Sequence, residues 1–149
     1  MNQPYNIKDL LPQSREMAFL DELVDYGDDW LEARLTITPK SKFYKDGSVP
    51  AWVGMEYMAQ AIAALAGARR KSQGEPIKVG VLVRCRDFKT EQPQFANGQT
   101  LTVRAEETFR DDNAGTYACS ITDGITDSTV IARASLSAYI PDNLKDILT

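Results

Sequence analysis

The stretch Trp52-Val-Gly-Met-Glu-Tyr-Met-Ala-Gln-Ala-Ile-Ala-Ala-Leu-Ala-Gly67 has an almost wholly apolar helix pattern that only Glu56, Tyr57 and Gln60 interrupt. A carboxylate is costly to bury in such a stretch, so we expect Glu56 to be paired, protonated or used in chemistry. The chain contains no histidine. Any chemistry at Glu56 must therefore proceed without the side chain that most often transfers protons near neutral pH.

The pattern predicts a helix from about Ala51 to about Ser72, which at about 1.5 Å per residue spans roughly 30 Å. Cationic side chains in its last turn suit the helix dipole, and Gly74 and Pro76 end it. Alternating apolar and polar residues predict strands around this helix. We expect strands at residues 17–25, 30–38, 78–89, 101–110, 116–122 and 130–140, a short helix at 7–11 and a loop at 39–50.

A helix that is apolar nearly all round must be enclosed, and a curved antiparallel sheet is the only element left to enclose it. Two strands, one long helix and then a meander of strands make the hot-dog fold, an α+β architecture. We expect it as a single domain over residues 1–149. One small sheet wrapped on one helix leaves exposed edges and apolar surface, so we also expect a dimer.

Composition narrows the classes of partner and ligand. The net charge of −4 argues against a general binder of nucleic acid or of membrane surfaces. The first residues show no secretory signal, and the polar and small residues of 51–68 favour a helix buried in protein over a membrane span. Cys85 and Cys119 lie in strand patterns and are interpreted as reduced core residues of a cytoplasmic protein. Without histidine or a cysteine cluster we expect no metal, and nothing predicts a cofactor.

The segment Gly54-Met-Glu-Tyr-Met-Ala-Gln60 resembles the central-helix motif of bacterial 3-hydroxyacyl-acyl-carrier-protein dehydratases, which read much like Glu-Ala-Met-Ala-Gln there. Leu11-Pro-Gln-Ser-Arg-Glu-Met-Ala-Phe-Leu-Asp21 looks like the opening strand of that family. Two later segments look like its strand and turn after the helix: Arg84-Cys-Arg-Asp-Phe-Lys89 and Asn97-Gly-Gln-Thr-Leu101. Val49-Pro-Ala-Trp52 suggests the branch that serves aryl-polyene synthesis.

The resemblance implies a lyase of fatty-acid or polyketide synthesis that removes water from a 3-hydroxyacyl thioester on an acyl carrier protein. In the family a histidine abstracts the α-proton and a helix carboxylate helps the hydroxyl leave. N–H groups at the helix N-terminus polarise the thioester carbonyl. By this resemblance Glu56 is the carboxylate, Gln60 orients it, and Gly54 lies where substrate approaches the backbone. Trp52 and Phe43 are candidates to line an acyl tunnel.

The sequence departs from the family at the histidine. One family position lies fourteen residues before the helix carboxylate, where this chain has Lys42, and another follows Leu-Pro, where it has Gln13. An amide has no useful proton affinity, and an unperturbed lysine is protonated near pH 7, so neither residue replaces the base. Gln13 is therefore a site residue only by its position. It is alternatively an engineered or unusual substitution of a family histidine.

Three functions remain open from the sequence. The first is a dehydratase subunit that forms a homodimer, or a heterodimer in which a histidine-containing paralogue completes the site. The second is a thioesterase that uses Glu56 alone to activate water. The third is a non-catalytic subunit that binds acyl chains or the carrier protein. Basic residues that could dock an acidic carrier are Arg69, Arg70, Lys71, Arg84, Arg86 and Lys89.

Overall fold

The computed structural model describes residues 5–12, 17–78, 80–111, 113–124 and 129–139, so the predicted position Gln13 lies outside the described residues. In chain order the elements are α1 (Ile7–Leu10), β1 (Glu22–Tyr26), β2 (Trp30–Thr36), β3 (Ser48–Pro50), the 3-10 turn η2 (Ala51–Val53), α2 (Gly54–Ser72), β4 (Val81–Thr90), β5 (Gln94–Ala96), β6 (Thr100–Asp111), β7 (Ala114–Asp123) and β8 (Val130–Tyr139).

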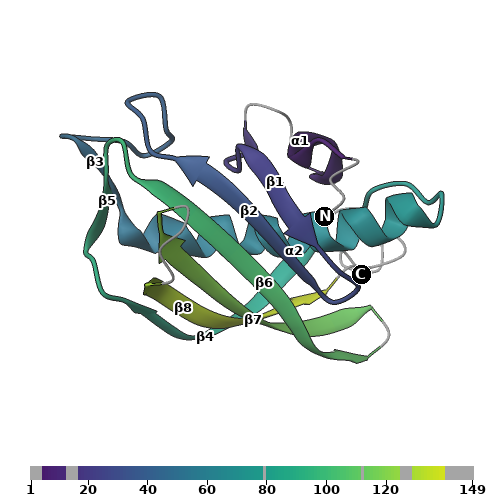
Figure 1. Ribbon diagram of the computed structural model, residues 1–149. Helices are drawn as coiled ribbons and strands as arrows, with labels where there is room; N and C mark the ends of the chain where they lie inside the picture. The colour runs from purple at the N-terminus through teal and green to yellow at the C-terminus, as the bar shows by residue number, and fades with distance from the viewer. Residues whose placement is uncertain (1–4, 13–16, 79, 112, 125–128, 140–149) are drawn as a thin grey trace.

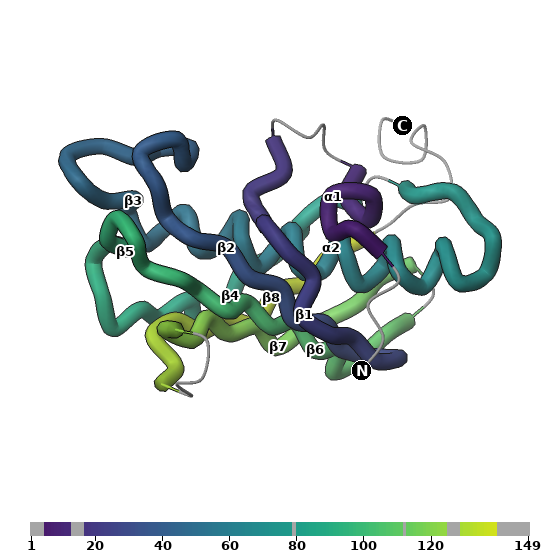
Figure 2. The backbone as a smooth tube through the Cα atoms, turned by 45° about the horizontal axis from the view of Figure 1, so that its top comes forward, coloured from purple at the N-terminus to yellow at the C-terminus, as the bar shows by residue number. Residues whose placement is uncertain are grey.

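One long helix lies along a curved sheet, as the apolar stretch predicts. α2 runs the length of the molecule behind the strands in Figure 1, with α1 beside its C-terminal half. The tube view of Figure 2 shows the same arrangement from above. All pairs of the six-stranded sheet are antiparallel, in the order β1-β2-β6-β7-β8-β4. The predicted hot-dog fold is confirmed. α2 ends at Ser72 as expected and begins three residues after the expected start, because the 3-10 turn η2 occupies residues 51–53.

The strand that follows the helix is not part of a meander, contrary to our expectation. β6, β7 and β8 pair in sequence, but β4 crosses to the far side of the sheet and pairs with β8. α2 follows β3, which belongs to the separate two-stranded sheet with β5, and leads to β4 at one edge of the six-stranded sheet. β4 therefore ends the sheet, with no strand of the described residues on its other side.

The first strand begins later than the sequence predicts. β1 starts at Glu22, whereas alternation suggested a start at Met17. Residues 17–20 are held by side chains instead of a neighbouring strand: the amide of Gln60 bonds Met17 and Phe19, and the Lys8 ammonium donates to the carbonyl of Leu20 over 3.0 Å. The loop predicted at 39–50 also contains a short strand, since β3 pairs with β5 through Val49 and Phe95.

The core lies between α2 and the inner face of the sheet. α2 packs chiefly on β6 and β2 and buries Tyr57, Met58, Ala61 and Leu65 against them. The described residues leave the opposite side of the helix partly open. Met55, Ala59, Ala63 and Ala66 are partly exposed, and Glu56 is exposed. The expectation that this chain alone surrounds the helix is therefore wrong, because one face stays open to solvent.

Candidate functional site

Glu56 lies in the first turn of α2, on the face of the helix that the sheet does not cover. Its side chain is exposed in the single chain. The sequence suggested a buried carboxylate whose cost needed an explanation, and this premise is wrong, because the apolar pattern continues onto an open helix face. Glu56 therefore carries no large desolvation cost here and is free to contact a ligand or a second subunit.

Gln60 lies one helical turn after Glu56, and its side chain is 1% exposed. Its amide oxygen accepts a hydrogen bond from the Phe19 N–H over 2.8 Å, and its amide nitrogen donates to the Met17 carbonyl over 2.9 Å. The same nitrogen donates to Oε1 of Glu56 over 3.3 Å. Because the two backbone bonds fix the orientation of the amide, its second N–H points at the carboxylate. Gln60 thus contacts Glu56 at the predicted i,i+4 spacing, and its role in orienting a catalytic carboxylate stays a prediction.

A groove of about 250 Å³ opens at Glu56 and follows α2. Its helix wall is made of small or aliphatic side chains, and its other wall comes from the residues before and at the start of β4. The full lining is Pro12, Glu56, Ala59, Ile62, Ala63, Ala66, Lys78, Gly80, Val81, Leu82 and Ala138. One carboxylate at the head of an apolar groove suits a ligand with an apolar tail and a polar reacting group.

The lining residues of this groove were not singled out from the sequence. Ala59, Ala63 and Ala66 follow Glu56 at helical spacing, and this spacing was the signal that could have identified one helix face. Leu82 and Lys78 join the groove only because β4 crosses the sheet, and no local pattern shows that crossover.

Gly54 is buried, and its lack of a side chain serves core packing. A Cβ at this position would meet Cδ1 of Ile121 at 3.1 Å and the ring of Phe95 at 3.5 Å. The Gly54 N–H donates to the carbonyl oxygens of Ala51 and Trp52, because η2 continues into α2. This N–H is therefore already bonded within the chain, and the approach of substrate to the backbone at Gly54 stays a prediction.

Trp52 and Phe43 form an exposed aromatic pair away from the groove. Their ring centroids are 5.2 Å apart at an edge-to-face angle of 63°, and their side chains are 55% and 57% exposed. Neither residue lines the groove that begins at Glu56. Lys42, at the position of one family histidine, is exposed beside Phe43. In the single chain the structure therefore brings Glu56 and Gln60 together and leaves these three residues outside their site.

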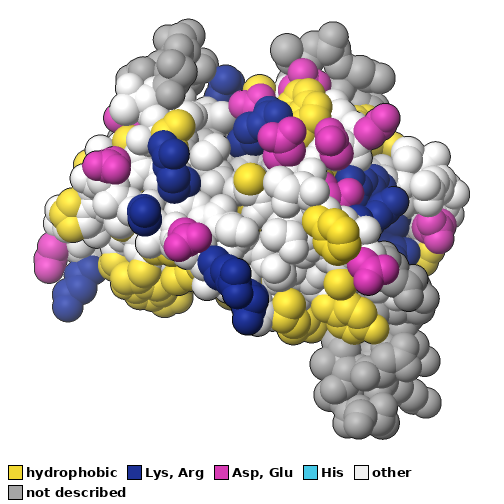
Figure 3. All heavy atoms as spheres, turned by 90° about the horizontal axis from the view of Figure 1, so that it is seen from below, with side chains coloured by type: hydrophobic (Ala, Val, Ile, Leu, Met, Phe, Trp, Pro, Cys, Tyr) yellow, Lys and Arg dark blue, Asp and Glu magenta, His cyan; other side chains and the backbone are white. Residues whose placement is uncertain are grey.

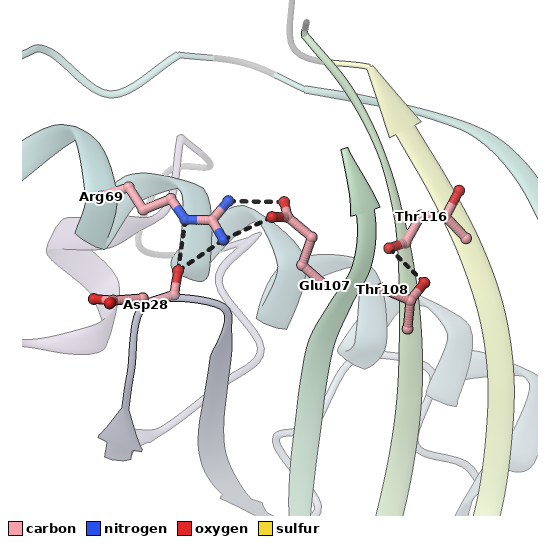
Figure 4. A network of polar contacts seen from close by, with 5 residues as sticks. All are labelled: Asp28, Arg69, Glu107, Thr108 and Thr116. Carbon is pink, nitrogen blue, oxygen red and sulfur yellow. Dashed lines mark hydrogen bonds and ion pairs between the residues drawn. The ribbon is translucent and has the colours of Figure 1, made fainter. Parts of the chain in front are cut away.

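The basic residues at the end of α2 divide into two kinds. Arg69 is bound within the fold: its guanidinium contacts Glu107 over 2.8 and 3.1 Å and donates twice to the Asp28 carbonyl (Figure 4). Burial alone lowers the pKa of Arg69, but the hydrogen bond and charge of Glu107 outweigh it, so the pKa is raised. Arg70 and Lys71 have no such described partner. Arg69 therefore ties the helix to β6 and is not available to dock a carrier.

The two cysteines lie on separate strands of the sheet. Cys85 on β4 and Cys119 on β7 are free thiols in strands; Cys119 is buried in the core as predicted, whereas Cys85 is only partly buried. Burial raises the pKa of Cys119 to about 12, which makes it a poor nucleophile. Among the described residues, no group of three or more histidine, cysteine or acidic side chains could hold a metal ion. None of the helices in the described part of the chain is long and apolar enough to cross a membrane.

Comparison with known proteins now decides the family. The family model of the ApeP-like proteins, described as ApeP dehydratase, matches residues 5–149. The chain belongs to the ApeP-like family. For this ApeP-like chain, the sequence resemblance to aryl-polyene dehydratases is confirmed. A search of curated proteins finds no match.

Solved structures share the fold of this ApeP-like chain. The dehydratase heterocomplex ApeI:P from Xenorhabdus doucetiae matches with a TM-score of 0.88 and 24% identity, over 97% of this chain and 95% of that one. A hypothetical thioesterase with coenzyme A from Streptococcus pneumoniae matches with a TM-score of 0.63 and 10% identity, over 80% and 84%. The PaaI protein of E. coli, from the phenylacetic acid degradation operon, matches with a TM-score of 0.60 and 19% identity, over 78% and 80%.

Proposed function

We propose that this chain is one subunit of an aryl-polyene dehydratase and supplies Glu56 to a site that a second, histidine-containing subunit completes. The observation that carries the proposal is the carboxylate itself. Gln60 positions Glu56 at the open head of an apolar groove, in a chain of 149 residues without histidine. A positioned carboxylate that faces solvent is half of an acid–base pair whose other half must come from another molecule.

The shape of the groove supports a 3-hydroxyacyl thioester as the substrate. From Glu56 to Ala66 the helix wall extends over about 15 Å at 1.5 Å per residue. Its side chains are small and apolar, so an acyl chain can lie along them while its thioester end stays at Glu56. An acyl carrier protein would present this thioester from outside the groove.

A second subunit is supported by the open face of α2. A water-filled site would weaken every electrostatic contribution to catalysis, so a dehydratase needs this face covered. The structural relative with a TM-score of 0.88 is described as a dehydratase heterocomplex, which is the assembly that the proposal requires. The partner would cover the groove and bring its histidine to the substrate carbon next to the thioester.

The proposed reaction removes one water and changes no oxidation state overall. The partner's histidine takes the α-proton, and the electron pair of that C–H bond forms the carbon–carbon double bond as the C3–O bond breaks. Glu56 delivers a proton to the departing hydroxyl, which leaves as water and gives the trans-2-enoyl thioester. The histidine then passes its proton to the Glu56 carboxylate, directly or through solvent, which resets both groups.

The test is a dehydration assay with separate and mixed subunits. A 3-hydroxyacyl-loaded acyl carrier protein is incubated with this chain, with a histidine-containing dehydratase subunit of the same organism, and with both. We expect enoyl product, detected as loss of one water by mass spectrometry, only in the mixture. Glu56→Gln should lower the rate by roughly 10²–10⁴, the usual contribution of a general acid or base. Glu75→Gln, an exposed carboxylate after α2, is the matched control and should retain the rate.

Three results would replace this proposal. Full dehydration by this chain alone would show that no partner histidine is needed. Release of free carrier thiol by this chain, abolished in Glu56→Gln, would instead favour the thioesterase function, in which Glu56 activates water without histidine. Tight binding of the loaded carrier with no turnover in any mixture would favour a non-catalytic subunit.

A further inference from the structure

The groove of Glu56 carries two charged side chains of opposite sign. Its helix wall begins at Glu56 and ends at Ala66, and Lys78 lines it from the segment before β4. Among the described residues of the lining, Glu56 is the only acid and Lys78 is the only cation, and the others are apolar or glycine. The carboxylate has a part in the proposed reaction, but the ammonium has none.

Lys78 belongs to the end of the groove that lies farthest from Glu56. The preceding residue, Ile77, packs beside α2 at Gly67, where an added Cβ would approach Cδ1 of Ile77 at 3.0 Å. Gly67 follows Ala66 and lies about 16 Å along the helix from Glu56, at 1.5 Å per residue. The half-buried Lys78 therefore places a positive charge at the distal end of an apolar groove.

A second hollow, on the outer face of the sheet, does not separate its charges in this way. It has a volume of about 570 Å³, and its charged lining residues are Asp87, Lys89, Arg104, Glu106 and Arg133. Arg104 is 3.9 Å from Glu106. On the face of the molecule in Figure 3, Lys and Arg side chains are likewise interspersed with Asp and Glu side chains. Because neighbouring opposite charges offset each other, this hollow is a weaker candidate for selective binding than the groove.

A ligand that fills the groove removes water from Lys78. An ammonium carries three N–H donors and no acceptor, so it can bind a ligand oxygen besides any contact within the chain. An acyl chain that ends in a methyl group offers no acceptor, and the loss of water from the ammonium would weaken its binding. A chain that ends in a hydroxyl, ether or carbonyl oxygen would replace this water with a charge-assisted hydrogen bond.

We propose that Lys78 is a specificity-determining residue that binds an oxygen atom at the distal end of the acyl chain, while Glu56 acts at the thioester end. This inference rests on the proposed function, since it assigns the orientation of the substrate and the chemistry of its far end. The apolar wall between the two charges sets the chain length that reaches both. Because this end of the chain does not change during dehydration, Lys78 contributes to KM and not to kcat.

The test measures binding with probes that cannot react. Each probe is an acyl chain on pantetheine in which an amide replaces the thioester and the 3-hydroxyl group is absent. The probes form pairs of equal length, in which one chain ends in a hydroxyl group and the other in a methyl group of nearly the same size. Dissociation constants are measured by isothermal titration calorimetry on this chain, alone and mixed with the histidine-containing subunit.

The expected result is a ratio of dissociation constants, methyl probe over hydroxyl probe, that is highest in wild type at the chain length that reaches Lys78. Lys78→Met should lower this ratio by about tenfold or more, the effect of one hydrogen bond to a charged group. Lys78→Arg keeps a cationic donor and should largely retain the ratio. Lys71→Met removes an exposed lysine outside the groove and is the matched control, which should behave as wild type.

Three results would overturn the inference: the same ratio at every chain length in wild type, an unchanged ratio in Lys78→Met, or no binding of either probe to either sample. Far-UV circular dichroism checks that each variant is folded, and the chain-length series in wild type needs no variant. Since the amide probes undergo neither dehydration nor hydrolysis, a failure of this test would leave the dehydration assay of Glu56 unaffected. An inactive mixture in that assay would equally leave the binding ratio measurable.

Discussion

Gln60 joins three parts of the chain through one buried amide: α2, the segment at residues 17–19 and the carboxylate of Glu56. Gln60→Leu keeps the volume but removes all three hydrogen bonds, and it leaves the Phe19 N–H and the Met17 carbonyl without this partner. We expect a loss of about 2–3 kcal/mol in the free energy of unfolding, since each unsatisfied buried polar group costs about 1–3 kcal/mol. Urea unfolding followed by circular dichroism measures it.

The control for Gln60 is Gln73→Leu, an exposed amide just after α2, which should change stability by no more than about 0.5 kcal/mol. In the mixed dehydration assay, Gln60→Leu should also lower kcat, because Glu56 loses its positioning contact. Equal stability of the two variants would contradict the structural role given to Gln60.

The stability of the Glu56→Gln variant distinguishes two hypotheses: that Glu56 is an exposed catalytic carboxylate, and that it is a buried structural one. Because Glu56 is exposed and has one long hydrogen bond, we expect the free energy of unfolding to change by no more than about 0.5 kcal/mol. Breaking a buried, paired charge would instead cost about 3–5 kcal/mol. Urea unfolding of the single chain decides between the two. A large loss in the free energy of unfolding would show that Glu56 has a structural role.

The contact between Glu56 and Gln60 could be predicted from the sequence, but the exposure of Glu56 and the residues that line its groove could not. A carboxylate and an amide four residues apart share a helix face whatever surrounds them, so the contact between Glu56 and Gln60 follows from local geometry. Which face the sheet covers depends on partners distant in the sequence. The apolar residues of α2 therefore divide into two sets: one set is buried against the sheet, and the other lies on a helix face that stays partly exposed.

At the scale of elements, the contact between α1 and α2 depends on Gly67. A Cβ at this position would overlap the carbonyl of Leu10 and approach Cδ1 of Ile77 at 3.0 Å. Gly67→Ala should therefore displace α1 from the helix. We expect a net loss of about 1–2 kcal/mol, because overpacking costs about 1–3 kcal/mol and the gain in helix propensity offsets about 1. Thermal unfolding, with proteolysis near residues 7–12, measures both effects.

Gly54→Ala is the comparison within the same helix. Its added Cβ meets the end of the flexible Ile121 side chain at 3.1 Å and not a backbone atom, so the helix gain should nearly cancel the strain. A Gly67→Ala variant as stable as Gly54→Ala would show that α1 shifts without cost.

Element types were predictable because alternation and helical periodicity are local, whereas their order in the sheet was not. β2, β6, β7 and β8 lie within two residues of their predicted bounds. The position of β4 beside β8 depends on a crossover, and the pairing of β3 with β5 joins segments more than forty residues apart. Such contacts leave little trace in one short window of sequence.

On the scale of the whole molecule, the open face of α2, the groove of Glu56 and the unpaired edge β4 meet on one side of the protein. The opposite face of the helix is buried under the sheet with Tyr57, and Tyr117 and Cys119 of β7 are buried on the sheet's inner face. Burial is the largest cause that raises the pKa of each of these three groups to about 12, with smaller contributions from Asp21, Glu107 and Cys85 respectively. The stability of the core between α2 and the sheet should therefore depend on pH in the alkaline range.

These raised pKa values predict that the protein loses stability between about pH 9 and pH 12. In the unfolded chain the pKa is 10.0 for tyrosine and 9.0 for cysteine, so the stabilising contribution of these groups is complete below pH 9. It is lost as the pH rises through the folded values, because the unfolded chain releases these protons first. Since one pKa unit corresponds to about 1.4 kcal/mol, each tyrosine contributes on the order of 2 kcal/mol of this loss. Urea midpoints at pH 8, 10 and 12 measure the decline.

Tyr117→Phe isolates one part of the alkaline loss, because phenylalanine cannot ionise while it fills nearly the same space. The variant should be less stable at pH 8, where the bond to Glu107 is missing, and should lose about 2 kcal/mol less than wild type between pH 10 and pH 12. Tyr44→Phe, in the loop before β3, is the matched control and should follow wild type. Parallel pH curves for Tyr117→Phe and wild type would mean that Tyr117 ionises without unfolding, and the inner face of the sheet would then be accessible to water.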